Sequence, residues 1–307
     1  MSSFSSLHII YRELGSQKGK IMAQFTNQAQ LTYGSVVANS NIATGEILEA
    51  LSLTKTAVVD TYSSGDTVTY ILSILNQGAT ALNGLSIVDD LGAYTFDTGL
   101  LVPLDYVDGS VKYYIDGVLQ ASPTVTAGPP LTISGISVTA GGNTTIVYEA
   151  SANVFAPLDT DGEITNTATV SGNGITPVQA TETVTAANAP EISITKSISP
   201  VPVAPNGLVS YTFIIENNGN TPLVATDNAV ITDVFDPILS NLSVTFNGTP
   251  WQEGVNYTYN EVSGEFASIA GQVVVDAATY TQAPNGAWSV APGISTLIVT
   301  GNIGSIT

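Results

Sequence analysis

The sequence contains no cysteine, one histidine (His8) and only six lysines and arginines among its 307 residues. Without cysteine there can be no disulfides and no thiolate metal sites. A single histidine leaves almost no room for histidine catalysis or histidine metal binding. The formal net charge of −19 argues against a nucleic-acid partner, because such partners are held by clustered cations. No apolar run approaches the roughly 20 residues that a spanning helix needs, so we expect no membrane insertion.

The residues that are abundant favour short strands joined by tight turns. Hydrophobic residues make up 44% of the chain and charged residues 10%, a balance that argues against disorder. Thr, Val, Ile, Ser, Asn and Gly are common, and no segment has the pattern of a long amphipathic helix. The sequence shows no catalytic triad, phosphate-binding loop or metal-ligand cluster, so we expect no enzyme and no cofactor.

The first 21 residues differ from the rest. An apolar patch at residues 7–11 precedes Arg12, Lys18 and Lys20, whereas a secretory signal has its charges before the apolar stretch. We therefore expect residues 1–21 to be a disordered leader or an extension outside the mature protein, with translation beginning at Met22. A genuine flexible N-terminal arm is the alternative.

The remainder of the chain contains an internal repeat. Residues 65–78 (GDTVTYILSILNQG) are echoed by residues 207–219 (GLVSYTFIIENNG). Three further pairs of segments match, namely residues 53–55 with 194–196, residues 87–91 with 231–235, and residues 137–147 with 289–299, the last without a gap. Apolar residues alternate with polar ones in these segments, which predicts the antiparallel strands of two tandem immunoglobulin-like β-sandwiches.

The two copies differ in completeness. The first copy continues into residues 164–170 (ITNTATV) and a further strand at 178–184, whereas the second ends at Thr307 before any equivalent. Residues 25–31 (FTNQAQL) match the missing strand. We therefore predict three parts: an N-terminal donor-strand arm at residues 22–50, a complete repeat at 51–190 (the first repeat) and an incomplete repeat at 191–307 (the second repeat).

This displacement predicts head-to-tail self-assembly. A sandwich without its closing strand leaves core side chains exposed and backbone groups unpaired. The arm of a neighbouring copy can supply that strand, and the contact joins two different surfaces, so it propagates as an open filament. The donor side chains are Phe25, Asn27, Ala29, Leu31 and Tyr33. A strand folded back onto its own second repeat is the alternative, but the short connection between the arm and the first repeat favours exchange between molecules.

Polar residues occur at positions that alternate with core residues. In the first repeat these are Lys55, Asp89 and Asn166, and in the second repeat they are Lys196 and Asp233. Burial lowers the pKa of a lysine and raises that of a carboxylic acid, so a neutral amine can attack an asparagine carbonyl and release ammonia. We expect an isopeptide bond between Lys55 and Asn166 assisted by Asp89, and one between Lys196 and Asn27 of the next subunit assisted by Asp233. The alternative is a buried, hydrogen-bonded pair with asparagine as a satisfied neighbour.

The pattern LTKT…GDTVTYILSILNQG…IVDDL…ITNTATV resembles the bacterial conserved-repeat family known as domain of unknown function number eleven. The resemblance covers both copies and the N-terminal strand, and it implies β-sandwich modules repeated in a surface protein. A two-copy chain without a signal is also similar to the major subunits of clostridial spore appendages, which assemble inside the mother cell. It implies an extracellular appendage or spore-surface location, release from the mother-cell cytoplasm, and an anchoring protein that the sequence does not identify.

Two further features of the sequence carry weaker signals. Asp159, Asp161 and Glu163 alternate around Gly162 as calcium ligands do, but the rest of a calcium-loop pattern is absent, so a solvated acidic turn is favoured. The alternative function is a monomeric surface adhesin or carbohydrate-binding module, which would be a stable monomer that needs a ligand.

Overall fold

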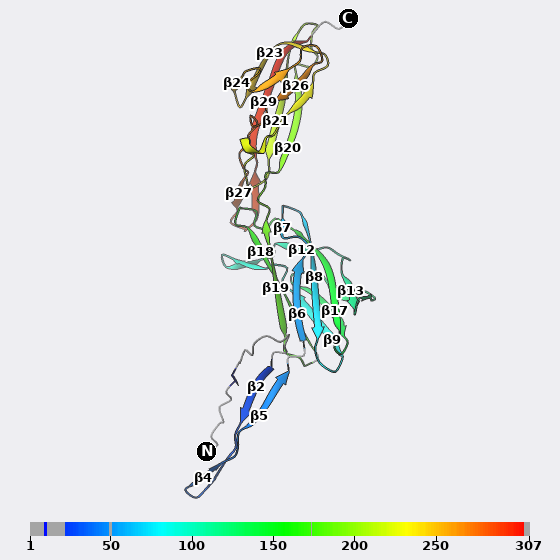
Figure 1. The fold of residues 1–307 in the computed structure, drawn as a ribbon, viewed down its shortest axis with the longest axis vertical. Coiled ribbons are helices and arrows are strands. Elements are labelled where there is room, and N and C mark those ends of the chain that lie inside the picture. Colours follow the sequence, from blue (N-terminus) through cyan, green and yellow to red (C-terminus); the bar gives the residue numbers. More distant parts are fainter. Residues whose placement is uncertain (1–8, 11–21, 49–50, 173, 304–307) are drawn as a thin grey trace. The chain divides into compact units, whose positions relative to one another are not determined.

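The computed structural model describes residues 9–10, 22–48, 51–172 and 174–303, and these residues form an all-β protein, as predicted (Figure 1). The only helix among them is the 3-10 turn η1 (Ala225–Asp227). In this part of the chain no helix is long and apolar enough to cross a membrane. Of the expected leader, the structure describes only β1 (Ile9–Ile10), which pairs with β2 (Met22–Asn27); the rest of residues 1–21 lies outside the described residues.

Contacts divide the chain into two compact units. The first unit contains the described residues within 1–60, 66–152 and 165–184. The second unit contains those within 61–65, 153–164 and 185–307.

Residues 22–48 form a long β-hairpin, which we call the N-terminal hairpin. Strand β2 (Met22–Asn27) pairs with β5 (Ala43–Leu48), and β3 (Gln30–Tyr33) pairs with β4 (Val36–Asn39). Gln28 and Ala29 interrupt the first arm of this hairpin between β2 and β3, and Ala29 N donates to Ser40 Oγ at 2.9 Å. The predicted donor is thus a two-stranded unit with an interruption, whereas the sequence indicated one continuous strand.

The first repeat is a sandwich of two sheets. The strand order of one sheet is β14 (Val118–Leu119), β13 (Lys112–Ile115), β17 (Asn143–Ala152), β8 (Thr67–Asn76) and β6 (Leu51–Ala57), with β12 (Leu104–Tyr106) also on β17. The order of the other is β15 (Thr124–Thr126), β16 (Leu131–Val138), β9 (Leu82–Asp89), β18 (Glu163–Ser171), β19 (Val178–Ala186) and β7 (Thr61–Tyr62). Strands β10 (Tyr94–Phe96) and β11 (Gly99–Leu101) form a separate hairpin. Alternating residues such as Tyr70, Leu72 and Ile87 are fully buried between the two main sheets, because every second side chain of a strand faces the same side.

The second repeat has one large sheet and one small one. The large sheet is ordered β20 (Ile192–Ser199), β21 (Leu208–Asn217), β29 (Gly293–Ile303), β23 (Leu239–Phe246) and β24 (Thr249–Trp251). The small sheet is ordered β22 (Thr232–Val234), β26 (Glu265–Ser268) and β25 (Tyr257–Tyr259), and β27 (Thr279–Gln282) pairs with β28 (Trp288–Ala291). Its core is rich in aromatic residues, with Phe235 packed on Tyr211 at a ring-centroid distance of 4.8 Å.

The structure corrects one of the repeat alignments. The gapless match sets Val147 against Val299, but the strand pairings place Tyr148 opposite Tyr70 and Val299 opposite Tyr211. Because Tyr70 and Tyr211 correspond, Val299 is the counterpart of Tyr148, one residue further on. The second repeat inserts the hairpin β27–β28 before β29, which shifts the alignment.

Candidate assembly and cross-linking site

The first repeat is completed by the hairpin of β18 and β19, which we call the closing hairpin. Strand β18 lies between β9 and β19 in its sheet, with Ala168 opposite Asp89 and Val170 opposite Ile87. Its inward side chains are buried, including Asn166, which is 0% exposed. The closing hairpin therefore covers the core and delivers an amide to it.

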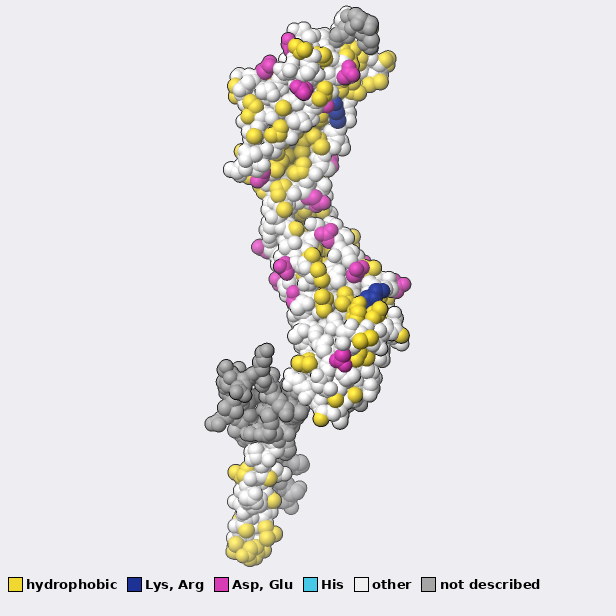
Figure 2. All heavy atoms as spheres, turned by 45° about the vertical axis from the view of Figure 1, so that its right-hand side comes forward, with side chains coloured by type: hydrophobic (Ala, Val, Ile, Leu, Met, Phe, Trp, Pro, Cys, Tyr) yellow, Lys and Arg dark blue, Asp and Glu magenta, His cyan; other side chains and the backbone are white. Residues whose placement is uncertain are grey.

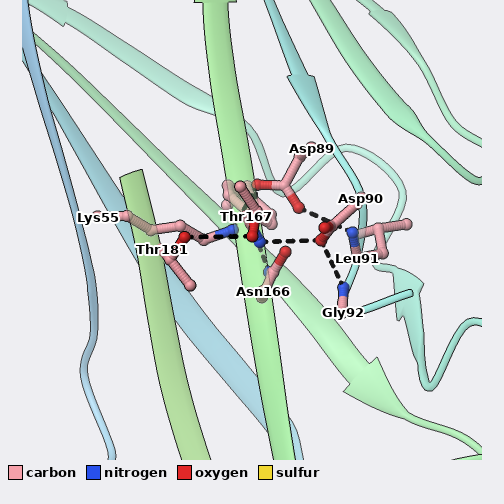
Figure 3. A network of polar contacts seen from close by, with 9 residues as sticks. Lys55, Asp89, Asp90, Leu91, Gly92, Asn166, Thr167 and Thr181 are labelled. Atoms are coloured by element: carbon pink, nitrogen blue, oxygen red, sulfur yellow. Dashed lines mark hydrogen bonds and ion pairs between the residues drawn. The ribbon is translucent and has the colours of Figure 1, made fainter. Parts of the chain in front are cut away.

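A connected polar cluster lies beneath the closing hairpin. Lys55 Nζ donates to Asp89 Oδ2 at 2.6 Å, and Tyr148 Oη donates to the same oxygen at 2.7 Å. Asn166 Nδ2 donates to Tyr148 Oη at 3.1 Å, and Asp89 Oδ1 accepts a hydrogen bond from Leu91 N at 3.0 Å. Figure 3 shows Lys55, Asp89 and Asn166 directed toward one another from β6, β9 and β18. The structure thus brings together the three residues that the sequence selected.

The surroundings of the cluster act on the pKa of its lysine. Burial lowers the pKa of Lys55 from its usual value of 10.5, although Asp89 acts in the opposite direction. Its amine lies 4.8 Å from the centre of the Tyr70 ring. Asn166 Oδ1 is buried and has no hydrogen-bond partner. An amine with a lowered pKa, in one connected cluster with an amide whose carbonyl oxygen has no partner, supplies the chemical groups for nucleophilic attack.

The second repeat contains the same lysine–aspartate pair in an open setting. Lys196 Nζ donates to Asp233 Oδ2. The two side chains are 39% and 17% exposed, whereas those of Lys55 and Asp89 are both 0% exposed. The sequence placed Lys196 in a core, and the structure leaves it at the surface of the described residues.

The difference arises from the neighbours of two strands. Within the described residues β22 has β26 on one side and no strand on the other, where β9 of the first repeat has β18. On β20, Ile192 and Ile194 are 42% and 52% exposed, whereas their counterparts Leu51 and Leu53 on β6 are 5% and 8% exposed.

A hollow lies on the small sheet of the second repeat. A cavity of about 610 Å³ is lined by residues of β22, β25 and β26, among them Asp233, Tyr259 and Phe266. Figure 2 shows hydrophobic side chains gathered on this C-terminal part of the chain and at the tip of the N-terminal hairpin.

The N-terminal hairpin exposes the predicted donor side chains. Leu31 and Tyr33 are 65% and 61% exposed, and Asn27 and Ala29 are also exposed. Phe25 pairs with Gly45 in the backbone ladder, but its side chain lies outside the described residues. An isolated two-stranded hairpin buries too little surface to be stable alone in water.

Sequence reasoning missed Tyr148, which joins Asp89 to Asn166. Its position was concealed by the misaligned repeat, although its alternation with Ile146 and Ala150 marks it as an inward residue. Sequence reasoning also missed a hydrogen bond that occurs in both repeats. Asn76 Nδ2 and Asn217 Nδ2 each donate to the backbone carbonyl oxygen four residues further on, at 2.8 Å in both cases.

The acidic loop carries no sign of a calcium site. Asp159 and Asp161 are exposed in a tight turn, in which Gly162 N donates to Asp159 O at 3.0 Å, and Glu163 begins β18. Among the described residues no three His, Cys, Asp or Glu side chains are grouped to hold a metal ion.

No protein-family model matches this sequence, and no curated protein matches it. Similar solved structures include the major pilin SpaD of Corynebacterium diphtheriae, at 11% identity and a TM-score of 0.33, covering 88% of this chain and 70% of that one. A C-terminal fragment of the major pilin GBS80 of Streptococcus agalactiae has 14% identity and a TM-score of 0.34, covering 79% and 91%. The collagen-binding subdomain of the Enterococcus faecalis surface protein ACE has 11% identity and a TM-score of 0.29, covering 44% and 96%. At these scores no function is transferred from them.

Proposed function

We propose that this protein is a structural subunit that polymerises head to tail, the N-terminal hairpin of one copy completing the second repeat of the next. The observation that carries the proposal is internal to the chain. Among the described residues, the first repeat has its closing hairpin beside β9 and the second has an open edge at β22. Residues 25–31 of the N-terminal hairpin are similar in sequence to residues 164–170 of the closing strand.

The first repeat supplies the expected register of the joint. Asn27 and Ala29 correspond to Asn166 and Ala168, and Asp233 corresponds to Asp89. Because Ala168 lies opposite Asp89, Ala29 of the donor is expected opposite Asp233. This register directs Asn27 toward the Lys196–Asp233 pair, and it directs Leu31 toward the core once docking brings residues 28 and 29 into one strand.

Burial of exposed apolar side chains is the driving force of this joint. Three isoleucines of β20, namely Ile192, Ile194 and Ile198, are at least 42% exposed, and Leu31 and Tyr33 of the donor are more exposed still. Full burial of such a side chain contributes ~1.5–3 kcal/mol. Five of them give several kcal/mol of favourable free energy before the cost of association, and the new backbone hydrogen bonds add to it.

The same proposal includes a covalent cross-link. The neutral amine of Lys196 attacks Cγ of Asn27 in the neighbouring copy, and a carbon–nitrogen bond forms as the bond from Cγ to Nδ2 breaks. One proton passes from the amine to the departing nitrogen, which leaves as ammonia. The reaction needs no oxidant and no cofactor. Lys55 and Asn166 react in the same way within the first repeat.

The location proposed for this filament is extracellular, on a cell or spore surface. The resemblance to surface-repeat proteins and spore-appendage subunits supports it, as does the acidic composition, which keeps exposed filaments soluble. An anchoring protein on that surface would be a further partner.

Denaturing gel electrophoresis after boiling in SDS and urea tests the polymer and its bond together. The wild-type chain is expected to give a ladder of multiples. Asn27→Ala and Lys196→Ala are each expected to abolish the ladder while electron microscopy still shows fibres. Deleting residues 22–48 is expected to abolish the fibres as well.

Matched substitutions provide the controls. Asn39→Ala alters the same hairpin, and Lys112→Ala removes an exposed lysine of the first repeat; both should leave the ladder unchanged. Wild-type chains that remain monomeric at high concentration would contradict the proposal and favour the adhesin alternative.

A further inference from the structure

The hydroxyl of Tyr148 touches both the acid and the amide of the first-repeat cluster. It donates to Asp89 Oδ2 at 2.7 Å and accepts from Asn166 Nδ2 at 3.1 Å. All three residues are 0% exposed, so bulk solvent does not reach this contact. The hydroxyl therefore lies against the nitrogen that would leave as ammonia if Lys55 attacked Asn166.

The second repeat has no hydroxyl at the equivalent place. Strand pairing sets Val299 opposite Tyr211, as Tyr148 is set opposite Tyr70. Val299 is fully buried. The lysine and aspartate are thus present in both repeats, and the tyrosine next to the amide is present in the first alone.

We propose that Tyr148 relays a proton from Asp89 to Asn166 Nδ2 during formation of the Lys55–Asn166 bond. The inference rests on the cross-linking reaction proposed above. In the resting cluster the amide nitrogen is planar and donates its hydrogen to Tyr148. When Lys55 adds to Cγ, that carbon becomes tetrahedral, Nδ2 gains a basic lone pair, and the hydrogen bond reverses.

The relay neither gains nor loses protons overall. After addition the Lys55 nitrogen is positively charged, and it gives one proton to Asp89 Oδ2, with which it is in contact at 2.6 Å. Asp89 passes a proton to Tyr148, which gives its own to Nδ2, and the bond from Cγ to Nδ2 breaks to release ammonia. Tyr148 and Asp89 finish in their initial states, and the net change is one new amide and one ammonia.

The relay makes the two proposed bonds unequal. Positioned proton transfer accelerates a reaction typically by 10²–10⁴-fold. The bond within the first repeat has this assistance, and the bond between subunits, next to Val299, lacks it. The first repeat therefore closes covalently before neighbouring chains become cross-linked.

Timed mass spectrometry of the full chain tests the relay. Chains carrying Lys196→Ala, in which only the first-repeat bond can form, are purified unfolded in urea, refolded by dilution and sampled into acid. Tyr148→Phe keeps the ring that stacks on Tyr70 at 5.5 Å, and it is expected to slow the loss of one ammonia by about 10²-fold. Tyr113→Phe is the matched control, because it removes a buried hydroxyl that binds Ser137 instead, and its rate should be unchanged.

Hydrogen exchange on the same samples separates relay from packing. Slow ammonia loss with the β18 amides still protected supports the relay. Slow loss with those amides unprotected overturns it, since Tyr148 would then act by holding the closing hairpin in place. Ammonia loss at the control rate in Tyr148→Phe overturns the relay and leaves the cross-link standing. If Tyr148-containing chains lose no ammonia, the cross-link and the relay both fail, while fibre formation is judged separately.

Discussion

At the scale of single residues, the same side chain behaves differently according to what covers it. Lys55 and Lys196 occupy equivalent positions and each contacts an aspartate. Burial lowers the pKa of Lys55, because the charged ammonium loses its hydration in the core. Lys196 keeps 39% of its side chain exposed and retains access to water. Covering the second repeat would therefore be the step that prepares Lys196 to react.

The lowered pKa of Lys55 predicts a pH dependence of the cross-link. Only the neutral amine attacks, so the rate of ammonia loss in refolding Lys196→Ala chains should rise with pH. Because burial lowers the pKa, the rate should level off below pH 10.5, the ordinary lysine value. The measurement is the rate by intact mass across a pH series.

A matched variant checks the cause of this profile. The Asp90 and Glu182 charges raise the pKa of Lys55 against the larger effect of burial. Glu182→Gln should therefore shift the profile to lower pH and increase the rate near neutrality. A rate that continues to rise past pH 10.5 would show that Lys55 is not desolvated before it reacts.

At the scale of secondary-structure elements, β6 and β20 are equivalent strands with different cover. Each is the edge strand of its sheet and pairs with one long neighbour, β8 or β21. The inward residues of β6 are buried against the opposite sheet, which the closing hairpin completes. Every residue of β20 is exposed. The strand sequences are alike, so the exposure comes from what is packed on them.

A pair of equivalent substitutions should separate folding from assembly. Leu53→Ala, in a covered position, is expected to destabilise the chain by about 2–5 kcal/mol. Ile194→Ala, in an open position, should change the stability of the unassembled chain by about 0.5 kcal/mol or less, but weaken assembly about tenfold or more, because it removes apolar surface that the joint would bury.

Denaturant unfolding of chains lacking residues 22–48 measures the first quantity, and the critical concentration for fibre formation in full-length chains measures the second. Equal destabilisation by the two substitutions would mean that β20 is already covered within one chain. Donor exchange at this strand would then be wrong.

At the scale of the whole molecule, the proposed joint gives each chain one donor and one acceptor, which predicts an unbranched polymer. The first repeat has its closing hairpin in place, so it offers no second acceptor. A joint between unlike surfaces continues until the donors or acceptors are used up.

A peptide of residues 22–48 should therefore act as a chain terminator. Added in excess to wild-type subunits before assembly, it is expected to occupy the second repeat and shorten the fibres, with a mass increase of one peptide less one ammonia per capped chain. An Asn27→Ala peptide should shorten them reversibly and leave the mass unchanged after denaturation. Fibres of unchanged length with either peptide would contradict the donor role of this segment.

The sequence alone was sufficient for the local and periodic features. Alternation located the long strands, such as β8 and β21, and identified the inward polar residues Lys55, Asp89 and Asn166. It succeeded because a strand's side-chain period is a property of the backbone itself. The all-β class followed from the same signal.

Only the tertiary structure decided which segments lie side by side. It placed Tyr148 between Asp89 and Asn166, made the arm a hairpin with an interruption at Gln28, and left Lys196 exposed. It also showed that the inserted β27–β28 hairpin displaces the repeat by one residue. These features depend on pairings between segments far apart in the chain, whose register is fixed by packing of the whole sheet, so neither periodicity nor local similarity contains them.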